Sequence, residues 1–190
     1  IKLAPNVGSS TGDNLSFGNA VAISGDTVVV ADSGCHPTGS CTVNAVGAVF
    51  IFTTSNNGAS YAEVAKLTDP EYTWGGNFGY AVAIEDGVVV IGAYQHSGGR
   101  PGAAYVYSAS DNFASYVKLT AGDITEGNDG FGFSVAIDGD TVAIGSNLAE
   151  AVYLFRTSDG GTRAVWKQLL RSIGTRMISA QVRLTPRWRS

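Results

Sequence analysis

Large and small apolar side chains alternate in three nearly identical stretches of the chain. Each stretch opens on a Phe-Gly pair and then alternates bulky residues with alanine, glycine or serine; the stretches are residues 17–23, 78–84 and 131–137. A period of two residues is that of a β-strand with two different faces. A short turn and a β-branched run follow each stretch, and this order predicts a β-hairpin. The pattern therefore predicts one hairpin repeated three times.

Two further strands complete each repeat. An aromatic strand follows each hairpin, over residues 48–52, 103–107 and 151–155, and a fourth strand ends near residues 68, 120 and 169. Four short antiparallel strands per unit are typical of a propeller blade, and one bulky and one bare face suit the place where neighbouring sheets converge. We expect blade 1 over 17–77, blade 2 over 78–130 and blade 3 over 131–170, with 1–16 as the end of a preceding repeat and an inter-blade loop.

The three copies resemble FG-GAP repeats, which are found in integrin alpha-subunit propellers and in many secreted or cell-surface proteins. The resemblance rests on the Val-Ala-Ile strand, the Gly-Asp turn, the later Ala-aromatic strand and the Phe-Gly signature, which consists of Phe17, Gly18, Phe78, Gly79, Phe131 and Gly132. It implies an all-β fold, a partial β-propeller of the FG-GAP type with about three four-stranded blades. A turn of two or three residues stands where integrin-type repeats have a calcium-binding loop. The resemblance therefore does not imply a calcium site at this position.

Three blades are too few to close a ring, because propellers typically have four to eight. An open arc would expose apolar sheet faces at both ends, and stacked repeats rely on their neighbours for burial. We therefore expect the remaining blades of a longer propeller, or another copy, to cover the ends. Lys2-Leu3 looks like the end of an earlier fourth strand, which favours a segment of a longer propeller.

Charge is distributed unevenly along the chain. Residues 1–155 hold four basic and fifteen acidic side chains. Such an acidic body excludes a nucleic-acid partner, since phosphate binding needs clustered Lys and Arg. The tail over 171–190 has five Arg and no acidic residue, and we expect it to be disordered or outside the repeat, with a basic arm for an anionic surface as the alternative. No apolar run approaches the roughly 20 residues of a membrane span, so we expect no membrane insertion within this chain.

In a meander of four antiparallel strands, the loop between the second and third strands and the loop to the next blade emerge at the same edge of the sheet. The long connections of the repeats therefore lie on one rim. Loops on a rigid repeat scaffold are where binding usually resides. Aromatic rings beside carboxylates can stack on sugars or form a protein-binding hot spot, although the same acids could simply be solvated and the rings packed on the next blade. The candidate binding residues on this rim are Asp69, Glu71, Tyr72, Trp74, Tyr94, His96, Asp123, Glu126 and Asp129.

The longest of these loops contains both cysteines. Cys35 and Cys41 lie six positions apart in a family that is often extracellular, so we expect a local disulfide that holds the shape of the loop. Asn14 begins a glycosylation sequon. His36 and His96 lack a fixed third ligand, and the carboxylates at 123, 126 and 129 do not have the spacing of a calcium loop. We therefore expect neither metal nor cofactor, with calcium as the alternative for which no loop motif matches.

The sequence favours a non-catalytic binding or adhesion module that presents this rim to a protein or glycan ligand, at the cell surface or outside the cell. The sequence contains no Gly-x-Ser-x-Gly motif and no other recognisable motif of a catalytic nucleophile. Two alternatives remain open. The chain could be a fragment of a propeller hydrolase or lyase acting on polysaccharide, because two rim carboxylates could meet at a suitable distance, or a structural spacer that binds nothing.

Overall fold

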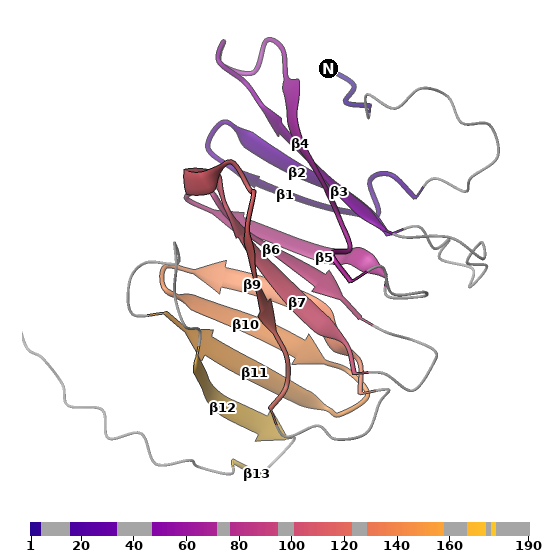
Figure 1. The fold of residues 1–190 in the computed structure, drawn as a ribbon, viewed down its shortest axis with the longest axis vertical. Helices are drawn as coiled ribbons and strands as arrows, with labels where there is room; N and C mark the ends of the chain where they lie inside the picture. The colour runs from indigo at the N-terminus through magenta and orange to yellow at the C-terminus, as the bar shows by residue number, and fades with distance from the viewer. Residues whose placement is uncertain are drawn as a thin grey trace, which may run out of the picture.

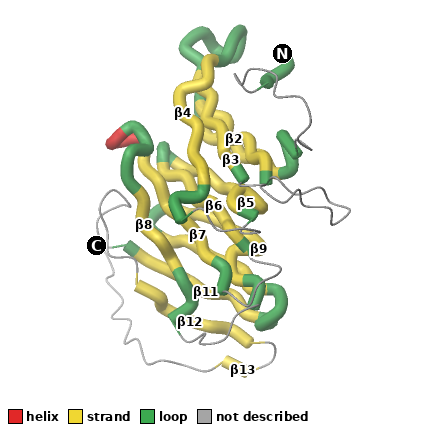
Figure 2. The backbone as a smooth tube through the Cα atoms, turned by 45° about the vertical axis from the view of Figure 1, so that its right-hand side comes forward, coloured by secondary structure: helices red, strands yellow, loops and turns green. Residues whose placement is uncertain are grey.

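The computed structural model describes residues 1–4, 16–33, 47–71, 77–94, 101–122 and 129–157, and the backbone of two strands over 167–173 and 176–177. These residues form three antiparallel sheets, and the only helical element among them is the 3-10 turn η1 (Ala109–Asp111). Figure 2 shows how strands dominate the described chain. The predicted all-β fold is confirmed.

Each sheet is a meander in which strands pair in chain order. Blade 1 contains β1 (Ala20–Ser24), β2 (Thr27–Asp32), β3 (Ala48–Thr53) and β4 (Ala62–Thr68). Blade 2 contains β5 (Phe78–Glu85), β6 (Val88–Ala93), β7 (Ala103–Ser108) and β8 (Tyr116–Leu119). Blade 3 contains β9 (Phe131–Asp138), β10 (Thr141–Ser146), β11 (Ala151–Arg156), β12 (Lys167–Ile173) and β13 (Arg176–Met177). The third sheet therefore runs past the boundary expected at residue 170, into the segment expected to lie outside the repeat.

The blades follow one another as a radial stack, from blade 1 at the top of Figure 1 to blade 3 at the bottom. The first strand of blade 2, β5, contacts the first strands of both neighbours, β1 and β9. Two apolar clusters lie between the sheets, one shared by blades 1 and 2 and one by blades 2 and 3. This arrangement is that of a partial propeller, in which each sheet buries its faces against adjacent sheets.

Bulky and bare faces of the first strands meet between the blades. Val82 and Ile84 of β5 share a cluster with Ala20 and Ala22 of β1. Blade 3 repeats this pairing, because Val135 and Ile137 pack in the cluster that Ala83 of β5 borders. Large side chains of one blade thus pack on the alanine face of the blade before it, which lets the sheets converge at their inner strands.

The Phe-Gly pair forms the middle of a backbone turn at the start of each blade. The amide two positions after each signature Phe donates to the carbonyl three residues earlier, at 2.9, 2.9 and 3.1 Å in blades 1, 2 and 3. The third residue of the turn has a φ of +92° at Gly18, +86° at Gly79 and +89° at Gly132. Glycine adopts this left-handed region without a Cβ penalty, so the turn requires it.

The phenylalanine of each signature packs on the aromatic strand of its own blade. Ring centroids lie 5.5 Å apart for Phe17 and Phe50, 5.6 Å for Phe78 and Tyr105, and 5.2 Å for Phe131 and Tyr153. Tilted and edge-on ring pairs at this separation are favourable beyond the area that they bury. The same contact in three blades explains why the repeat keeps an aromatic residue at both positions.

Candidate functional site

The sheets have two rims of different character. We call the edge at which β1, β5 and β9 begin and β2, β6 and β10 end the loop rim, and the edge with the hairpin turns the turn rim; the β1–β2 and β9–β10 turns point to the left in Figure 1. Four of the predicted binding residues lie on the described part of the loop rim, namely Asp69, Glu71, Tyr94 and Asp129. The remaining predicted site residues lie outside the described residues, and these are Asn14, Cys35, Cys41, Tyr72, Trp74, His96, Asp123 and Glu126.

A bulge at the start of β5 and of β9 turns one aromatic side chain toward the loop rim. Phe78 pairs with Ala93 and the next pair is Ala81 with Gly92, so the register skips Gly79 and Tyr80. The register of β9 skips Gly132 and Phe133 in the same way. Because bulges redirect side chains out of the ladder, the residue after each Phe-Gly pair becomes available to the rim.

Tyr80, Tyr94 and Phe133 form a cluster of three rings, which we call the rim aromatic cluster. Ring centroids are 4.5 Å apart for Tyr80 and Tyr94, 5.1 Å for Tyr80 and Phe133, and 5.3 Å for Tyr94 and Phe133. Tyr94 is buried, whereas Tyr80 and Phe133 are only partly buried. The cluster joins blade 2 to blade 3, so its surface exists only when both blades are packed together.

Tyr94 is held as a neutral ring on a fixed backbone. Burial, and next to it the neighbouring Tyr80, raises the pKa of the Tyr94 hydroxyl above its ordinary value of 10.0. Nδ2 of Asn77 donates to the carbonyl of Tyr94 at 3.1 Å in a buried hydrogen bond. A neutral phenol on a rigid strand end offers an apolar ring and a polar tip, which are the properties that enrich tyrosine at binding surfaces.

Blade 1 has a polar residue where blades 2 and 3 have Tyr80 and Phe133. Nδ2 of Asn19 donates to the carbonyl of Gly79 at 3.2 Å, and Oδ1 of Asn19 accepts from the amide of Ser33 at 2.9 Å. Asn19 therefore ties the end of β2 to the Phe-Gly turn of the next blade. Among the described residues of the loop rim, the aromatic cluster accordingly belongs to blades 2 and 3.

Three aspartates of the loop rim are buried and support the backbone. Carboxylate oxygens that accept from nearby amides stabilise turns in the manner of an Asx turn. Asp32 accepts from the amide of Ser16 at 3.0 Å, Asp69 from that of Glu71 at 2.9 Å and Asp129 from that of Phe131 at 3.0 Å. In Asp69 and Asp129, two of the predicted binding residues, this role leaves little surface for a ligand.

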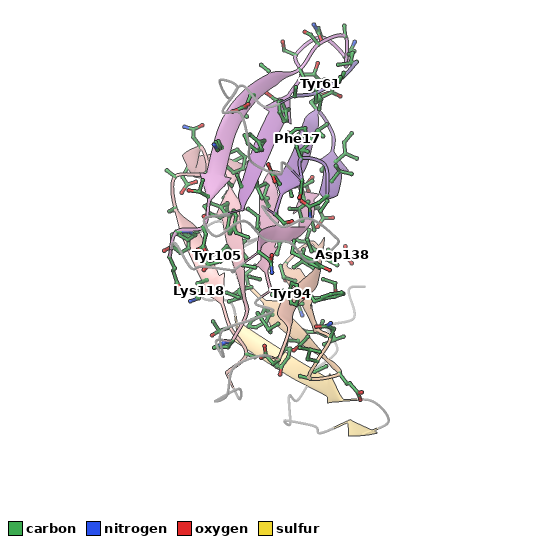
Figure 3. All side chains as sticks on the ribbon, turned by 90° about the vertical axis from the view of Figure 1, so that its right-hand side faces the viewer. Phe17, Tyr61, Tyr94, Tyr105, Lys118 and Asp138 are labelled. Carbon is green, nitrogen blue, oxygen red and sulfur yellow. The ribbon has the colours of Figure 1, made fainter. Side chains whose placement is uncertain are left out.

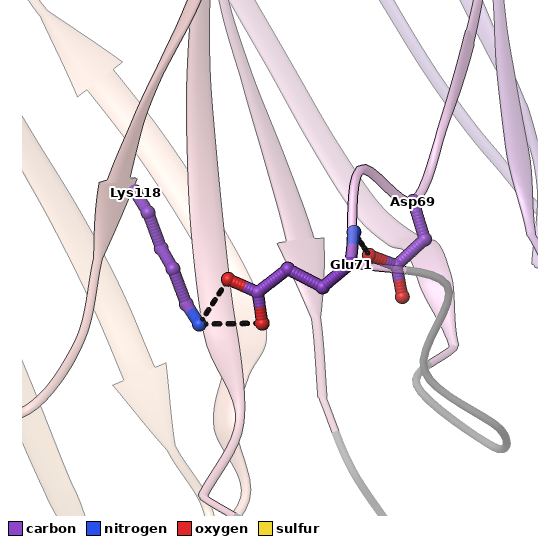
Figure 4. A network of polar contacts seen from close by, with 3 residues as sticks. All are labelled: Asp69, Glu71 and Lys118. Carbon is purple, nitrogen blue, oxygen red and sulfur yellow. Dashed lines mark hydrogen bonds and ion pairs between the residues drawn. The ribbon is translucent and has the colours of Figure 1, made fainter.

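Glu71 differs from these aspartates because its side chain is exposed and pairs across two blades. Nζ of Lys118, on β8, lies 2.6 Å from one carboxylate oxygen of Glu71 and 2.8 Å from the other, as Figure 4 shows. Lys118 lies beside Tyr105 in the stick view of Figure 3. An exposed ion pair of this kind contributes at most about 1 kcal/mol to stability. Its main effect is to hold the segment after β4 of blade 1 against β8, the outer strand of blade 2.

Two buried tyrosines near these carboxylates have perturbed acidity. Burial, then Tyr116 and then Asp69, raises the pKa of Tyr107 to about 12. Burial, with further contributions led by the charges of Asp69 and Glu71, also raises the pKa of Tyr105. Both rings lie in the cluster between blades 1 and 2. Their phenolate forms would place negative charge in an apolar interface.

We expect this interface to weaken in alkali. The folded chain holds the Tyr107 proton more tightly than the unfolded chain does, so the stabilisation is complete below pH 10 and is lost as the pH rises through about 12. The loss is roughly 1.4 kcal/mol per pH unit for each such tyrosine. Urea unfolding of the wild type and of Tyr107→Phe between pH 9 and pH 12 measures it: the variant should lose less, and equal slopes would contradict the assignment.

The turn rim has a hollow of about 330 Å³ between blades 2 and 3, with Glu85, Asp86 and Asp140 among its lining residues. Two of these carboxylates already have partners in blade 3. Glu85 accepts from the amide of Gly139 at 2.5 Å, and Asp140 lies 3.0 Å from Nε of Arg156, whose hydrogen bond lowers the pKa of Asp140. The hydrogen bond between Glu85 and Gly139 therefore joins the two blades at this hollow, whereas the Asp140–Arg156 pair lies within blade 3.

Within the described parts of the chain, no group of three or more His, Cys, Asp or Glu side chains is placed to hold a metal ion. The described residues also contain no helix long and apolar enough to cross a membrane.

Sequence reasoning missed Tyr80 and Phe133, two of the three rings in the rim aromatic cluster. Both follow a Phe-Gly pair and were included in the strand pattern. The repeat itself contained a signal, because this position changes from Asn19 to Tyr80 to Phe133 while the residues on either side hardly change. A variable position within a constant repeat marks a side chain that the fold does not need, and such positions on a repeat scaffold often carry binding.

Comparison with known proteins supports the repeat assignment. A family model described as FG-GAP repeat matches residues 61–107 and 109–162, which together make up more than half of the chain. The first match covers β4 to β7 up to residue 107, and the second covers β8 to β11. Each match therefore contains the fourth strand of one blade and the first three strands of the next. A search of curated proteins gave no match. With its Phe-Gly turns, radial sheets and two family matches, the chain belongs to the FG-GAP repeat family and folds as a β-propeller-type module.

Proposed function

We propose that the protein is a non-catalytic binding module that presents its loop rim to a protein or glycan ligand, with the rim aromatic cluster as the anchor. The observation that carries the proposal is the contact of Tyr80, Tyr94 and Phe133 across two blades, with two of the rings partly exposed. Tyrosine is enriched among residues that dominate binding energy. A ring pair that is already packed also loses little conformational freedom when a ligand stacks on it.

The site of action in this proposal is the cell surface or the extracellular space. FG-GAP repeats occur in extracellular and surface proteins, and the match to that family is what favours this location. The ligand would meet a rim with aromatic rings at blades 2 and 3 and the Glu71–Lys118 pair beside blade 2. A sugar face or an apolar protein side chain suits the rings, and hydroxyl or amide groups suit the polar neighbours.

The test compares Tyr80→Ala and Phe133→Ala with the wild type on a glycan array and on a panel of purified extracellular-matrix proteins. A ligand of the wild type should bind at least about tenfold more weakly to either variant, as expected for an anchor residue that contributes more than 1.4 kcal/mol. Tyr80→Phe keeps the ring and should retain most of the binding. Circular dichroism and the thermal midpoint show whether each variant is folded.

Tyr116→Ala is the matched control. Tyr116 lies on β8, is 44% exposed and contacts Tyr105 and Tyr107, so the substitution removes an exposed tyrosine of the same blade away from the cluster. Ligand binding should be unchanged in this variant. A wild-type protein that binds nothing on either panel, or a ligand that Tyr80→Ala and Phe133→Ala bind as well as the wild type does, would refute the proposal.

A further inference from the structure

We propose that Asn57 is a site of spontaneous deamidation and that the hydroxyl of Thr54 controls the rate of this reaction. Asn57 and Gly58 lie at the tip of the connection between β3 and β4, at the top of Figure 1. Asparagine is among the residues that are chemically least stable on heating. No residue of the rim aromatic cluster takes part, so the inference is independent of the proposed binding function.

Asn57 and Gly58 form the centre of a tight turn. The amide of Ala59 donates to the carbonyl of Asn56 at 3.2 Å across this turn. The φ angles are +54° at Asn57 and +82° at Gly58, the left-handed values that an Asn-Gly pair adopts readily. Gly58 has no side chain, so nothing attached to its Cα hinders its amide nitrogen from reaching the Cγ of Asn57.

The side chains of the two adjacent asparagines are held differently. Oδ1 of Asn56 accepts from the hydroxyl of Thr54 and from the amide of Ser60, both at 2.8 Å, and its Nδ2 donates to the hydroxyl of Ser60 at 2.7 Å. Asn57 is exposed, and no described residue forms a hydrogen bond with its side chain. Asn57 can therefore rotate until its Cγ faces the nitrogen of Gly58, whereas Asn56 would first lose three hydrogen bonds.

Thr54 restrains the nitrogen that has to attack. The amide of Gly58 donates to Oγ1 of Thr54 at 3.1 Å. Attack on the Cγ of Asn57 requires this nitrogen to give up its proton, so the hydrogen bond has to break first. Thr54 is buried, and its own amide donates to the carbonyl of Asp26 at 3.0 Å, which fixes the position of the hydroxyl. One such hydrogen bond should slow the reaction roughly two- to tenfold.

The reaction needs water and no other reagent. The nitrogen of Gly58 forms a bond to the Cγ of Asn57 and loses its proton, while the bond from Cγ to Nδ2 breaks and the side-chain nitrogen leaves as ammonia. Water then opens the cyclic imide at either carbonyl, and the product is aspartate or isoaspartate. Both products add a negative charge to the turn rim. Isoaspartate also adds a methylene to the backbone that the hydrogen bond between Asn56 and Ala59 closes.

Asn112 is the matched site in blade 2. It is exposed, has a φ of +56° and lies in the connection between β7 and β8. The next residue is Phe113, whose amide donates to the carbonyl of Ser108 at 2.9 Å and whose side chain packs against the cluster between blades 1 and 2. The backbone hydrogen bond and the bulk of Phe113 both hinder attack, so Asn112 should stay intact where Asn57 reacts.

The experiment incubates the whole chain in mildly alkaline buffer and follows each asparagine by peptide mass spectrometry. Deamidation appears as the mass change of NH₂ replaced by OH, and electron-transfer fragmentation distinguishes isoaspartate from aspartate. In the wild type, Asn57 should convert and Asn112 should not. Thr54→Val removes the hydroxyl and should raise the rate at Asn57 roughly two- to tenfold. Thr54→Ser keeps a hydroxyl and should react at a rate close to that of the wild type.

Circular dichroism shows whether both variants are folded, and the wild type in urea supplies the rate of Asn57 without the turn. Two results would overturn the proposal. The first is a folded wild type in which Asn57 stays intact over the time in which the unfolded chain converts. The second is an equal rate in folded Thr54→Val and in the wild type, because Thr54 would then not restrain the amide of Gly58.

Discussion

Gly132→Ala is expected to lower the free energy of unfolding by at least about 3 kcal/mol. The new Cβ would lie 2.3 Å from the carbonyl oxygen of Ala103 and 3.1 Å from the amide nitrogen of Ala93. Both are backbone atoms in central strands of blade 2, so no side-chain rotation can relieve the contact. The substitution also places a non-glycine residue at a φ of +89°, which costs roughly 1–2 kcal/mol by itself.

Gly18→Ala separates these two causes. Gly18 has a φ of +92°, but no atom of the described residues lies within 4 Å of its Cβ position, so only the backbone strain of roughly 1–2 kcal/mol should appear. Urea unfolding followed by circular dichroism measures both variants against the wild type. The difference between them reports the cost of pushing blades 2 and 3 apart. Equal losses in the two variants would show that the blades do not approach each other as closely as this structure has them.

The strands and their grouping could be predicted because the information is local. Large and small side chains alternate with a period of two at Val21, Ala22 and Ile23, and this local pattern is enough to identify a strand. Its recurrence in each of the three repeats marks the first strand of each blade. The bare and bulky faces were expected where neighbouring sheets converge, and the structure adds that bulky Val82 of one blade packs with Ala20 of the blade before it.

The candidate site could not be predicted to the same degree, because it depends on how local irregularities are placed in three dimensions. The only sequence signal for the bulge that exposes Tyr80 is the glycine before it. The ring that packs against Tyr80, that of Phe133, comes from the next blade. The rim aspartates were expected to be available to a ligand. Asp69 and Asp129 instead accept hydrogen bonds from neighbouring amides and are buried, and sequence composition does not distinguish a structural carboxylate from a binding one.

The first strand of blade 1 keeps the repeat pattern without the contact that accompanies this pattern in the other two blades. Gly18, Val21 and Ile23 follow the pattern of the internal blades although no described residue covers them. Glu150 departs from the pattern of Gly47 and Gly102 on the opposite side of the arc.

Phe78→Ala is expected to cost about 3–5 kcal/mol of unfolding free energy. Phe78 is fully buried, lies 5.6 Å from the ring of Tyr105 and belongs to the cluster between blades 1 and 2, so its removal leaves a cavity that both sheets line. The sheets are rigid four-stranded units, and they cannot collapse into such a space without shifting the whole blade contact.

Phe17→Ala is the matched comparison, because the same ring is removed from the same turn in blade 1. Phe17 is only partly buried and contacts Phe50 and Phe52 of its own blade at 5.5 and 6.4 Å. Its loss should cost clearly less, on the order of 1–2 kcal/mol, since no described strand of another blade closes over the space. Both variants are measured by urea unfolding at neutral pH. A loss in Phe17→Ala as large as that in Phe78→Ala would mean that the aromatic contact within one blade supplies the stability, and that the neighbouring sheet adds nothing to it.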